Sequence, residues 1–173
     1  MLQKFVTEFA ECADPLTSFD PVGVGSDEMF FGRSGFIAGC LWLRRQLGRQ
    51  IVPEEKMFLL CDIMLESGRR FSRYVKVKGC KRSSIIVVLL SRKVSSKCPL
   101  MYSYYETQYL GGAHGLTGVL LQLLSVPHYL EHNPGAEKDI KAAVNFIVSN
   151  QTYDGNFLCS MGEVPVMIYC CLP

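Results

Sequence analysis

A unit marked by two glycines occurs twice in this chain, and this repetition restricts the fold more than any other feature of the sequence. Gly32-x-x-Gly35 opens the first unit and Gly112-x-x-Gly115 opens the second. In each unit a helical segment with apolar residues on nearly every face follows, then a loop, then a helix with a single apolar stripe. A helix that is apolar all round belongs inside a protein, whereas a one-sided helix has a wet face. Stacked units therefore predict an all-α fold, an incomplete α/α arc in which outer helices wall inner ones.

Local signals predict where these helices begin and end. The inner helices are expected over residues 29–48 and 116–126. Pro53 and Asn133-Pro134 mark the starts of the outer helices, because proline suits the first helical turn. Gly68 is the expected stop of the first outer helix, since glycine commonly ends helices. The remaining expectations are an N-terminal helix with apolar residues at Leu2, Phe5, Val6 and Phe9, loops over 13–27 and 127–135, and a turn at 153–156.

The second glycine turn is the part of the chain best suited to chemistry. His114 lies in the turn that opens a helix, where backbone N–H groups without helical partners point at bound anions. It is therefore the candidate catalytic residue, for proton transfer or ligand contact. Gly112 and Gly115 shape the turn and are candidate substrate-binding positions. The alternative is that His114 only packs against the turn or caps it.

Composition favours one domain in a reducing compartment. With 173 residues, of which 49% are hydrophobic, a single globular domain is expected. The N-terminal segment carries Glu8 and Glu11 where a signal peptide would need an apolar core. No segment reaches the roughly 18 apolar residues that a membrane span requires. The eight cysteines include no C-x-x-C pair and resemble no zinc-ribbon spacing, so a cytoplasmic setting fits best.

Positive charge is concentrated in one segment. Between Ser67 and Tyr105 there are ten Lys or Arg residues and no Asp or Glu, which leaves the rest of the chain at a net charge of −8. Such a block can meet a membrane surface or nucleic acid, although a solvated loop is the favoured interpretation. No nucleic-acid partner is expected, because the block lacks interleaved aromatic residues and a known module. Within it, residues 85–90 have the composition of a short strand without an evident pairing partner.

Three stretches carry a family resemblance: FFGRSGFIAGCLWL, CPLMYSYYETQYLGGAHGLTGVL and AAVNFIVSN. Together they resemble the eukaryotic lanthionine synthetase C-like (LanC-like) proteins, over about residues 20–73 and 98–163. The resemblance implies an α/α toroid whose inner-helix turns frame a zinc site. Bacterial relatives add a cysteine thiol to a dehydroamino acid, and eukaryotic relatives are associated with glutathione and its addition to dehydroamino acids. Zinc lowers the pKa of the thiol and holds the thiolate as the nucleophile.

The resemblance also implies roles for two residues. His114 corresponds to a histidine beside the zinc site, a proton donor or acceptor. Arg33, in the earlier glycine turn, is a candidate substrate-binding residue for an anionic group such as a glutathione carboxylate, with a surface salt bridge as the alternative.

The chain departs from the family pattern at the metal ligands. The family takes them from a Trp-Cys-His-Gly type motif and a later Cys-His-Gly, whereas this sequence has no Cys-His pair and a single tryptophan, Trp42. Catalytic zinc needs three protein ligands, so no metal ligand is assigned and this chain is not expected to bind zinc. We therefore expect residues 1–173 to form one partial LanC-like domain, with 75–97 as an atypical insert and 164–173 as an atypical tail.

Two functional classes remain open. In the first, zinc-assisted addition of a thiol, from glutathione or a peptide cysteine, to dehydroamino acids is the activity of a complete protein, of which this chain carries one wall and is inactive alone. In the second, the chain is a non-catalytic scaffold or adaptor that binds glutathione, a protein partner or the plasma membrane surface. An incomplete arc would expose apolar faces, so poor solubility is expected.

Overall fold

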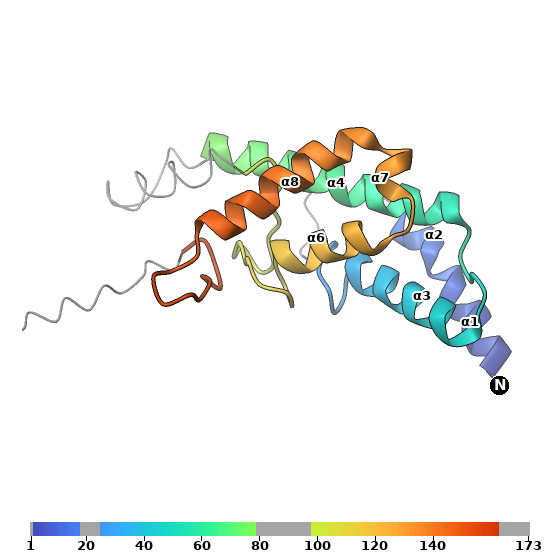
Figure 1. The fold of residues 1–173 in the computed structure, drawn as a ribbon. Coiled ribbons are helices and arrows are strands. Elements are labelled where there is room, and N and C mark those ends of the chain that lie inside the picture. Colours follow the sequence, from blue (N-terminus) through green and yellow to red (C-terminus); the bar gives the residue numbers. More distant parts are fainter. Residues whose placement is uncertain (1, 18–24, 79–97, 163–173) are drawn as a thin grey trace, which may run out of the picture.

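The described part of the chain is helical. The structure, a computed structural model, describes residues 2–17, 25–78 and 98–162, except for the side chains of residues 75–78 (Figure 1). Within these ranges the only β pairing consists of isolated bridges, so the all-α prediction is confirmed. The helices are α1 (Leu2–Glu11), α2 (Ala13–Leu16), α3 (Arg33–Leu47), α4 (Glu54–Lys78), α6 (Leu116–Ser125), α7 (Tyr129–His132) and α8 (Pro134–Ser149).

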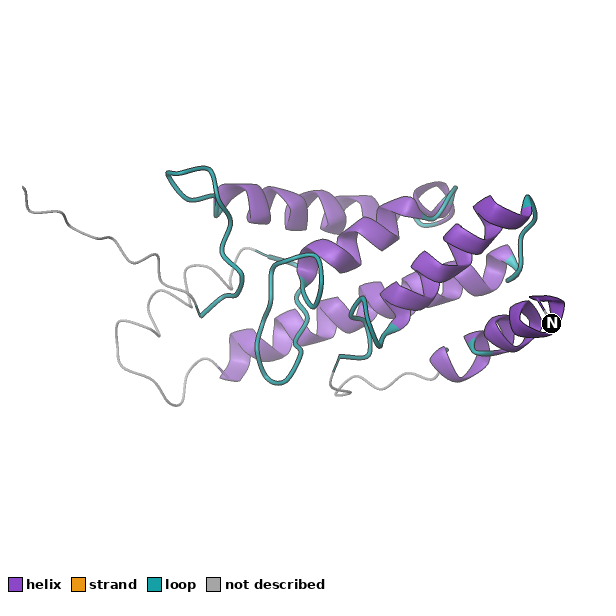
Figure 2. Cartoon of the chain, turned by 90° about the horizontal axis from the view of Figure 1, so that it is seen from below, coloured by secondary structure: helices purple, strands orange, loops and turns teal. Residues whose placement is uncertain are grey.

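The long helices form two layers. Helices α3 and α6 lie side by side in one layer, and α4 and α8 form the other, as Figures 1 and 2 show from two directions. Buried apolar side chains fill the space between the layers, among them Ile37, Leu60, Leu116 and Ile140. Each unit thus supplies an inner helix followed by an outer one, as the repeat predicted. The N-terminal helix α1 packs on α3, with the ring of Phe9 stacked on that of Phe36 at 5.0 Å.

Helix α4 does not stop at Gly68, contrary to the prediction. It continues to Lys78, into the segment expected to be an atypical insert. Gly68 instead permits a close approach: a Cβ there would clash with the ring of Tyr102, whose hydroxyl donates to Met64 O at 3.0 Å. The N–H of Met101 donates to Gly68 O at 3.1 Å. The glycine is therefore needed for packing of residues 98–102 on α4 and not for ending the helix.

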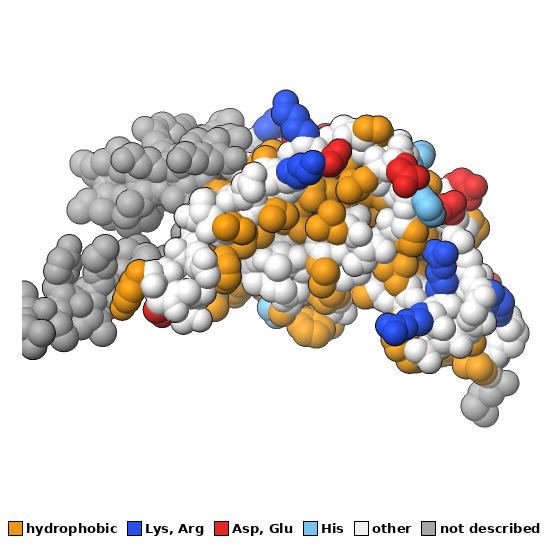
Figure 3. Space-filling model, viewed as in Figure 1, with side chains coloured by type: hydrophobic (Ala, Val, Ile, Leu, Met, Phe, Trp, Pro, Cys, Tyr) orange, Lys and Arg blue, Asp and Glu red, His pale blue; other side chains and the backbone are white. Residues whose placement is uncertain are grey.

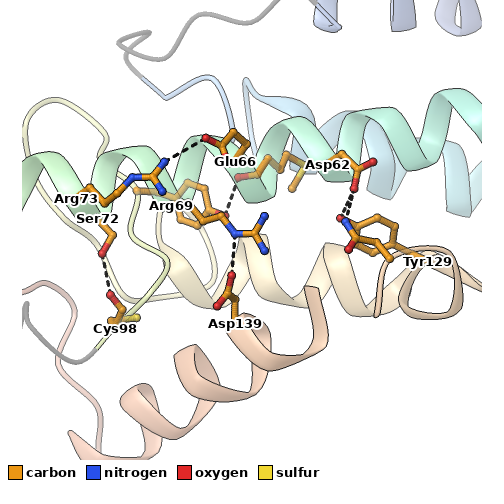
Figure 4. A network of polar contacts seen from close by, with 11 residues as sticks. Asp62, Glu66, Arg69, Ser72, Arg73, Cys98, Tyr129 and Asp139 are labelled. Carbon is orange, nitrogen blue, oxygen red and sulfur yellow. Dashed lines mark hydrogen bonds and ion pairs between the residues drawn. The ribbon is translucent and has the colours of Figure 1, made fainter. Parts of the chain in front are cut away.

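Polar contacts tie α4 to its neighbours, as Figure 4 shows. Arg69 pairs with Asp139 of α8 at 2.7 Å, and Ser72 donates to Cys98 O at 2.7 Å. The hydroxyl of Tyr129, a fully buried residue of α7, donates to Asp62 at 2.9 Å. These bonds fix α7 and α8 on the outer layer.

Two expectations about burial need correction. The C-terminal half of α3 is largely exposed, including Trp42, and α6 exposes one face that includes Leu121 and Leu124. The inner helices are therefore not covered all round, because no described residue packs over these faces. Figure 3 shows hydrophobic side chains spread over the exposed side of this assembly. The short helices α2 and α7, inside the predicted loops 13–27 and 127–135, were not predicted, whereas α8 begins at Pro134 as expected.

Residues 79–97 of the basic block fall outside the described residues, and so do the candidate strand 85–90 within them and the tail 164–173. The first arginines of the block lie on α4 in ion pairs: Arg69 with Asp139, and Arg70 and Arg73 with Glu66 at 3.0 and 3.1 Å. Among the described helices, none combines the length and the apolar character needed to cross a bilayer.

Candidate functional site

The two glycine corners are built alike, in a register that differs from the predicted one. Gly32 and Gly115 are the N-cap residues of α3 and α6, both with extended backbone (φ −110°, ψ −170° and φ −124°, ψ −169°). Gly35 and Gly118 follow three residues later, and a Cβ on either would clash with the carbonyl of the residue six positions earlier. Gly32 is thus equivalent to Gly115, and the predicted alignment of Gly32 with Gly112 is wrong by three residues.

Side-chain hydrogen bonds repeat in the same register. Ser34 Oγ donates to Asp27 O at 2.5 Å, and Thr117 Oγ1 donates to Leu110 O at 2.5 Å. In each corner the hydroxyl in the first helical turn therefore bonds the carbonyl seven residues earlier. The incoming chain is held against the start of its helix in the same way twice.

Both corners open at one mouth. The N–H of Met29, in the first corner, donates to the carbonyl of Ala113, in the second, at 3.2 Å. This bond places the two glycine turns at the same end of the inner layer. In the corrected register Phe31 and His114 occupy equivalent positions, each directly before an N-cap glycine.

The mouth contains a carboxylate–imidazole pair. His114 Nδ1 lies 3.0 Å from Glu28 Oε2, across 86 positions of sequence. The side chain of Glu28 is only 2% exposed, while that of His114 is 33% exposed. The second carboxylate oxygen of Glu28, Oε1, accepts the N–H of Phe31. The buried carboxylate thus has a partner on each oxygen, as a buried charge requires.

Aromatic rings surround the imidazole. The ring of Tyr104 is stacked on it at 4.5 Å with an interplanar angle of 6°. Phe30 meets it edge-on at 5.3 Å, and Tyr109 is tilted against it at 5.9 Å. Packing on these sides fixes the orientation of the ring that Glu28 holds at one end.

This arrangement leaves one imidazole nitrogen for chemistry. When Glu28 is ionised its oxygens can only accept hydrogen bonds, so Nδ1 is then the donor, and the neutral imidazole keeps a lone pair on Nε2. A carboxylate bonded to one ring nitrogen also fixes the orientation of the ring. In the Ser-His-Asp triads of hydrolases, a carboxylate bonded to one ring nitrogen orients the catalytic histidine in the same way. An imidazole held in this way can accept and return a proton at Nε2.

Arg33 lies in a buried ion pair and not at the surface. Its Nη1 is 2.8 Å from Asp27 Oδ1, with both side chains less than 7% exposed, and its Nε donates to Leu16 O at 2.8 Å. Ser67 on α4 donates to the other oxygen of Asp27 at 2.6 Å. Burial raises the pKa of Asp27, against the opposing effects of Ser67 and Arg33. The surface salt bridge expected for Arg33 is therefore a buried one, which ties the first corner to α2 and α4.

The glycines of the second corner differ in their surroundings. Gly112 is exposed with open space around it, whereas a Cβ on Gly115 would clash with the backbone of Tyr109. Gly115 is thus required by packing, while Gly112 leaves the mouth open beside His114.

Sequence reasoning missed Glu28 and Asp27. Asp27 is the last residue of the predicted loop 13–27 and Glu28 follows it, before the helix expected over 29–48, yet Asp27 is 5% exposed and Glu28 is 3% exposed. The available signal was an acidic pair a few residues before a glycine corner that opens a buried helix.

The described residues do not form a site for the zinc that the family resemblance implies. Nowhere in the described ranges do three His, Cys, Asp or Glu side chains gather as metal ligands. Beside His114 stand one carboxylate, already bonded on both oxygens, and the rings of Phe30, Tyr104 and Tyr109, none of which is a Cys, His, Asp or Glu of the kind that usually binds zinc.

Comparison with known proteins gives two findings. The family described as lanthionine synthetase C-like protein matches residues 2–165. A protein of Danio rerio named glutathione S-transferase LANCL1 is 26% identical over 167 residues, which cover 94% of this chain and 36% of that protein. The chain thus spans little more than a third of the length of this relative. Because the match extends over nearly all of the sequence and agrees with the layered helices, the chain belongs to the lanthionine synthetase C-like family.

Proposed function

We propose that this chain supplies the proton-transfer part of a site that adds a thiol to the double bond of a dehydroamino acid. The observation that carries the proposal is the hydrogen bond between His114 and the buried Glu28 at the shared mouth of the two corners. Family membership supports the reaction class, and the name of the Danio rerio relative supports glutathione as the thiol.

The reaction needs one proton to be moved. The sulfur of the thiol bonds the β-carbon of the dehydroamino acid, and the electrons of the carbon–carbon double bond move to the α-carbon. The thiol loses its proton and the α-carbon gains one, so the sum is neutral. Nε2 of His114 accepts the first proton and delivers the second, and Glu28 stabilises the imidazolium in between. Gly112, which leaves open space beside His114, gives the peptide backbone room to approach.

Zinc would supply thiol activation in such a reaction. The described residues do not fit a three-ligand zinc site. No step proposed here therefore runs through the metal. Arg33, which is held by Asp27, acts in this proposal by positioning the first corner and not by contacting substrate.

The test compares two histidine–glutamate pairs in the same chain. His128 and Glu131 have the same atoms in contact, Nδ1 and Oε2 at 3.2 Å, but both are exposed on the outer layer. Glutathione and a dehydroalanine peptide are incubated with the protein at about pH 8, where a fraction of the glutathione thiol is ionised without any help from the protein. Adduct formation is followed by mass spectrometry.

We expect His114→Asn to lower the rate above background by about 100-fold or more, the usual contribution of a proton-transfer group. Glu28→Gln should lower it less, since the imidazole remains. The matched variants His128→Asn and Glu131→Gln should leave the rate unchanged, with circular dichroism confirming the fold of each. Equal rates in the two sets would remove the proposal. No acceleration by the unsubstituted chain would also remove it, and would agree with the expectation that this chain is inactive alone.

A second candidate is a non-catalytic adaptor at the cytoplasmic side of a membrane or in the cytosol. The observation that favours it is the exposed apolar face of α6, with Leu121 and Leu124. Glutathione binding by calorimetry without any adduct formation would favour this candidate.

A further inference from the structure

Two adjacent phenylalanines project from the mouth of the site. Phe30 is 66% exposed and Phe31 is 79% exposed, although large apolar side chains gain by leaving water. Two hydrogen bonds to Glu28 fix the turn that carries these rings. The N–H of Gly32 donates to Glu28 O at 3.1 Å, and the N–H of Phe31 donates to the Glu28 carboxylate. The same turn that buries Glu28 therefore displays both rings beside His114. Figure 3 shows hydrophobic side chains projecting next to a histidine at the lower edge of the molecule.

A second aromatic group faces the mouth from the other corner. Tyr104 and Thr107 exchange backbone hydrogen bonds of 2.9 and 3.0 Å around a two-residue turn. The central residues of this turn, Tyr105 and Glu106, have φ of 45° and 62°, a conformation that favours glycine. Tyr105 is 73% exposed and its ring packs edge-on against Tyr104, the ring stacked on His114. Strain held at such a place points to a functional constraint.

We propose that Phe30, Phe31 and Tyr105 form an aromatic rim that binds the side chain next to the dehydroamino acid of a peptide substrate and prefers a bulky apolar residue there. This inference rests on the proposed function, since it places the α-carbon within reach of His114 Nε2. Consecutive Cα atoms are about 3.8 Å apart. A neighbouring side chain therefore lies near the ring of Phe30, whose centroid is 5.3 Å from that of the imidazole.

The chemistry of the rim decides which reactant it serves. Glutathione carries two carboxylates and an amine but no bulky apolar side chain, so it gains little from three exposed rings. A cationic group would compete with His114 for the face of Tyr104, which the imidazole already covers. The rim therefore suits the apolar flank of the acceptor peptide, and selectivity lies with that reactant.

The test separates binding from reaction. Two fluorescent hexapeptides are prepared with a central alanine in place of the dehydroalanine, flanked by phenylalanine in one and by serine in the other. Their affinities for the chain are measured by fluorescence anisotropy. The variants are Phe30→Ser and Phe31→Ser, which change exposed residues, and the control is Tyr153→Ser, whose side chain is 99% exposed in the turn after α8.

We expect the phenylalanine-flanked peptide to bind about 10-fold more tightly or better, the usual discrimination of an apolar contact. This difference should shrink to about 2-fold or less in Phe30→Ser and Phe31→Ser and persist in Tyr153→Ser. Equal affinities, no binding of either peptide, or a preference that survives both rim variants would overturn the proposal.

The two proposals can fail separately. Because the peptides cannot react, a preference that depends on the rim stands even if no adduct forms with dehydroalanine peptides. Conversely, adduct formation that depends on His114 but ignores the flanking residue would retain the proposed function and reject the rim.

Discussion

At the scale of single residues, Glu28 shows how burial and hydrogen bonding produce a reactive group. A carboxylate at 2% exposure is costly unless each oxygen has a donor, and the Phe31 N–H and the His114 imidazole supply them. Removing one partner from such a buried group costs about 1–3 kcal/mol or more. The folding of the first corner thus offsets the cost of burying Glu28 and so fixes the orientation of His114.

The cysteines give a prediction at this scale. Burial raises the pKa of the Cys40 and Cys61 thiols to about 12, with a further rise at Cys61 from the nearby Asp62 charge. Because the thiolate is the nucleophile, these two residues should resist iodoacetamide at about pH 8. The exposed Cys12 and Cys159 should be alkylated first. Mass spectrometry of peptides from the native chain checks the order, and early alkylation of Cys61 would contradict it.

The same shift has a consequence for stability. A folded-state pKa above the ordinary value of 9.0 means that folding favours the protonated thiol. The contribution of Cys40 and Cys61 is therefore complete below about pH 9 and is lost as the pH rises toward 12. Cys61→Ala should reduce this alkaline loss of unfolding free energy, measured against Cys12→Ala.

At the scale of helices, the glycine corners decide where the inner helices start. Gly35 and Gly118 lie in the first turn of α3 and α6, against the carbonyls of Met29 and Gly112. The incoming chain can cross so close only because neither residue has a Cβ. This crossing brings the Glu28 turn onto the start of α3.

The sign of the change in unfolding free energy on substituting Gly118 tests this close crossing. Glycine to alanine inside a helix ordinarily stabilises by about 1 kcal/mol. Here the added methyl meets a backbone carbonyl, so Gly118→Ala should instead destabilise by about 1–3 kcal/mol, the cost of overpacking. Gly111→Ala, where a Cβ has open space, should change the unfolding free energy by less than about 0.5 kcal/mol. Urea unfolding measures both, and a more stable Gly118→Ala variant would refute the close crossing.

At the scale of the whole molecule, the two layers leave apolar surface uncovered. Leu121 and Leu124 on α6 and Val144 and Val148 on α8 are between 37% and 57% exposed, on helices that are otherwise packed. Figure 3 shows such side chains across the face of these helices. Contiguous apolar patches of this kind mark interaction sites or cause association.

We therefore predict that the chain self-associates at micromolar concentration. The double variant Leu121→Glu and Val148→Lys removes apolar surface and keeps the net charge unchanged. Sedimentation velocity should show a shift from oligomers toward monomer in this variant. A monodisperse monomer with a cooperative melt in the unsubstituted chain would contradict the prediction.

Local patterns were enough to predict much of the architecture. The N-terminal helix, the helix that follows each glycine corner and the start of α8 at Pro134 are confirmed by the structure. These features depend on residues within a few positions of one another, where helix geometry relates sequence spacing directly to position. The roles of Gly112, Gly115 and His114 in binding and catalysis stay predictions.

The sequence alone thus determined an all-α chain of paired helices with glycine corners and a histidine at one of them. Only the tertiary structure decided that Glu28 holds His114, that Arg33 is buried against Asp27, and that α4 passes through Gly68. The physical reason is distance along the chain. Each of these outcomes is set by a contact with a segment far away in sequence or by burial under a neighbouring element, and no local pattern encodes which distant residue will fill that place.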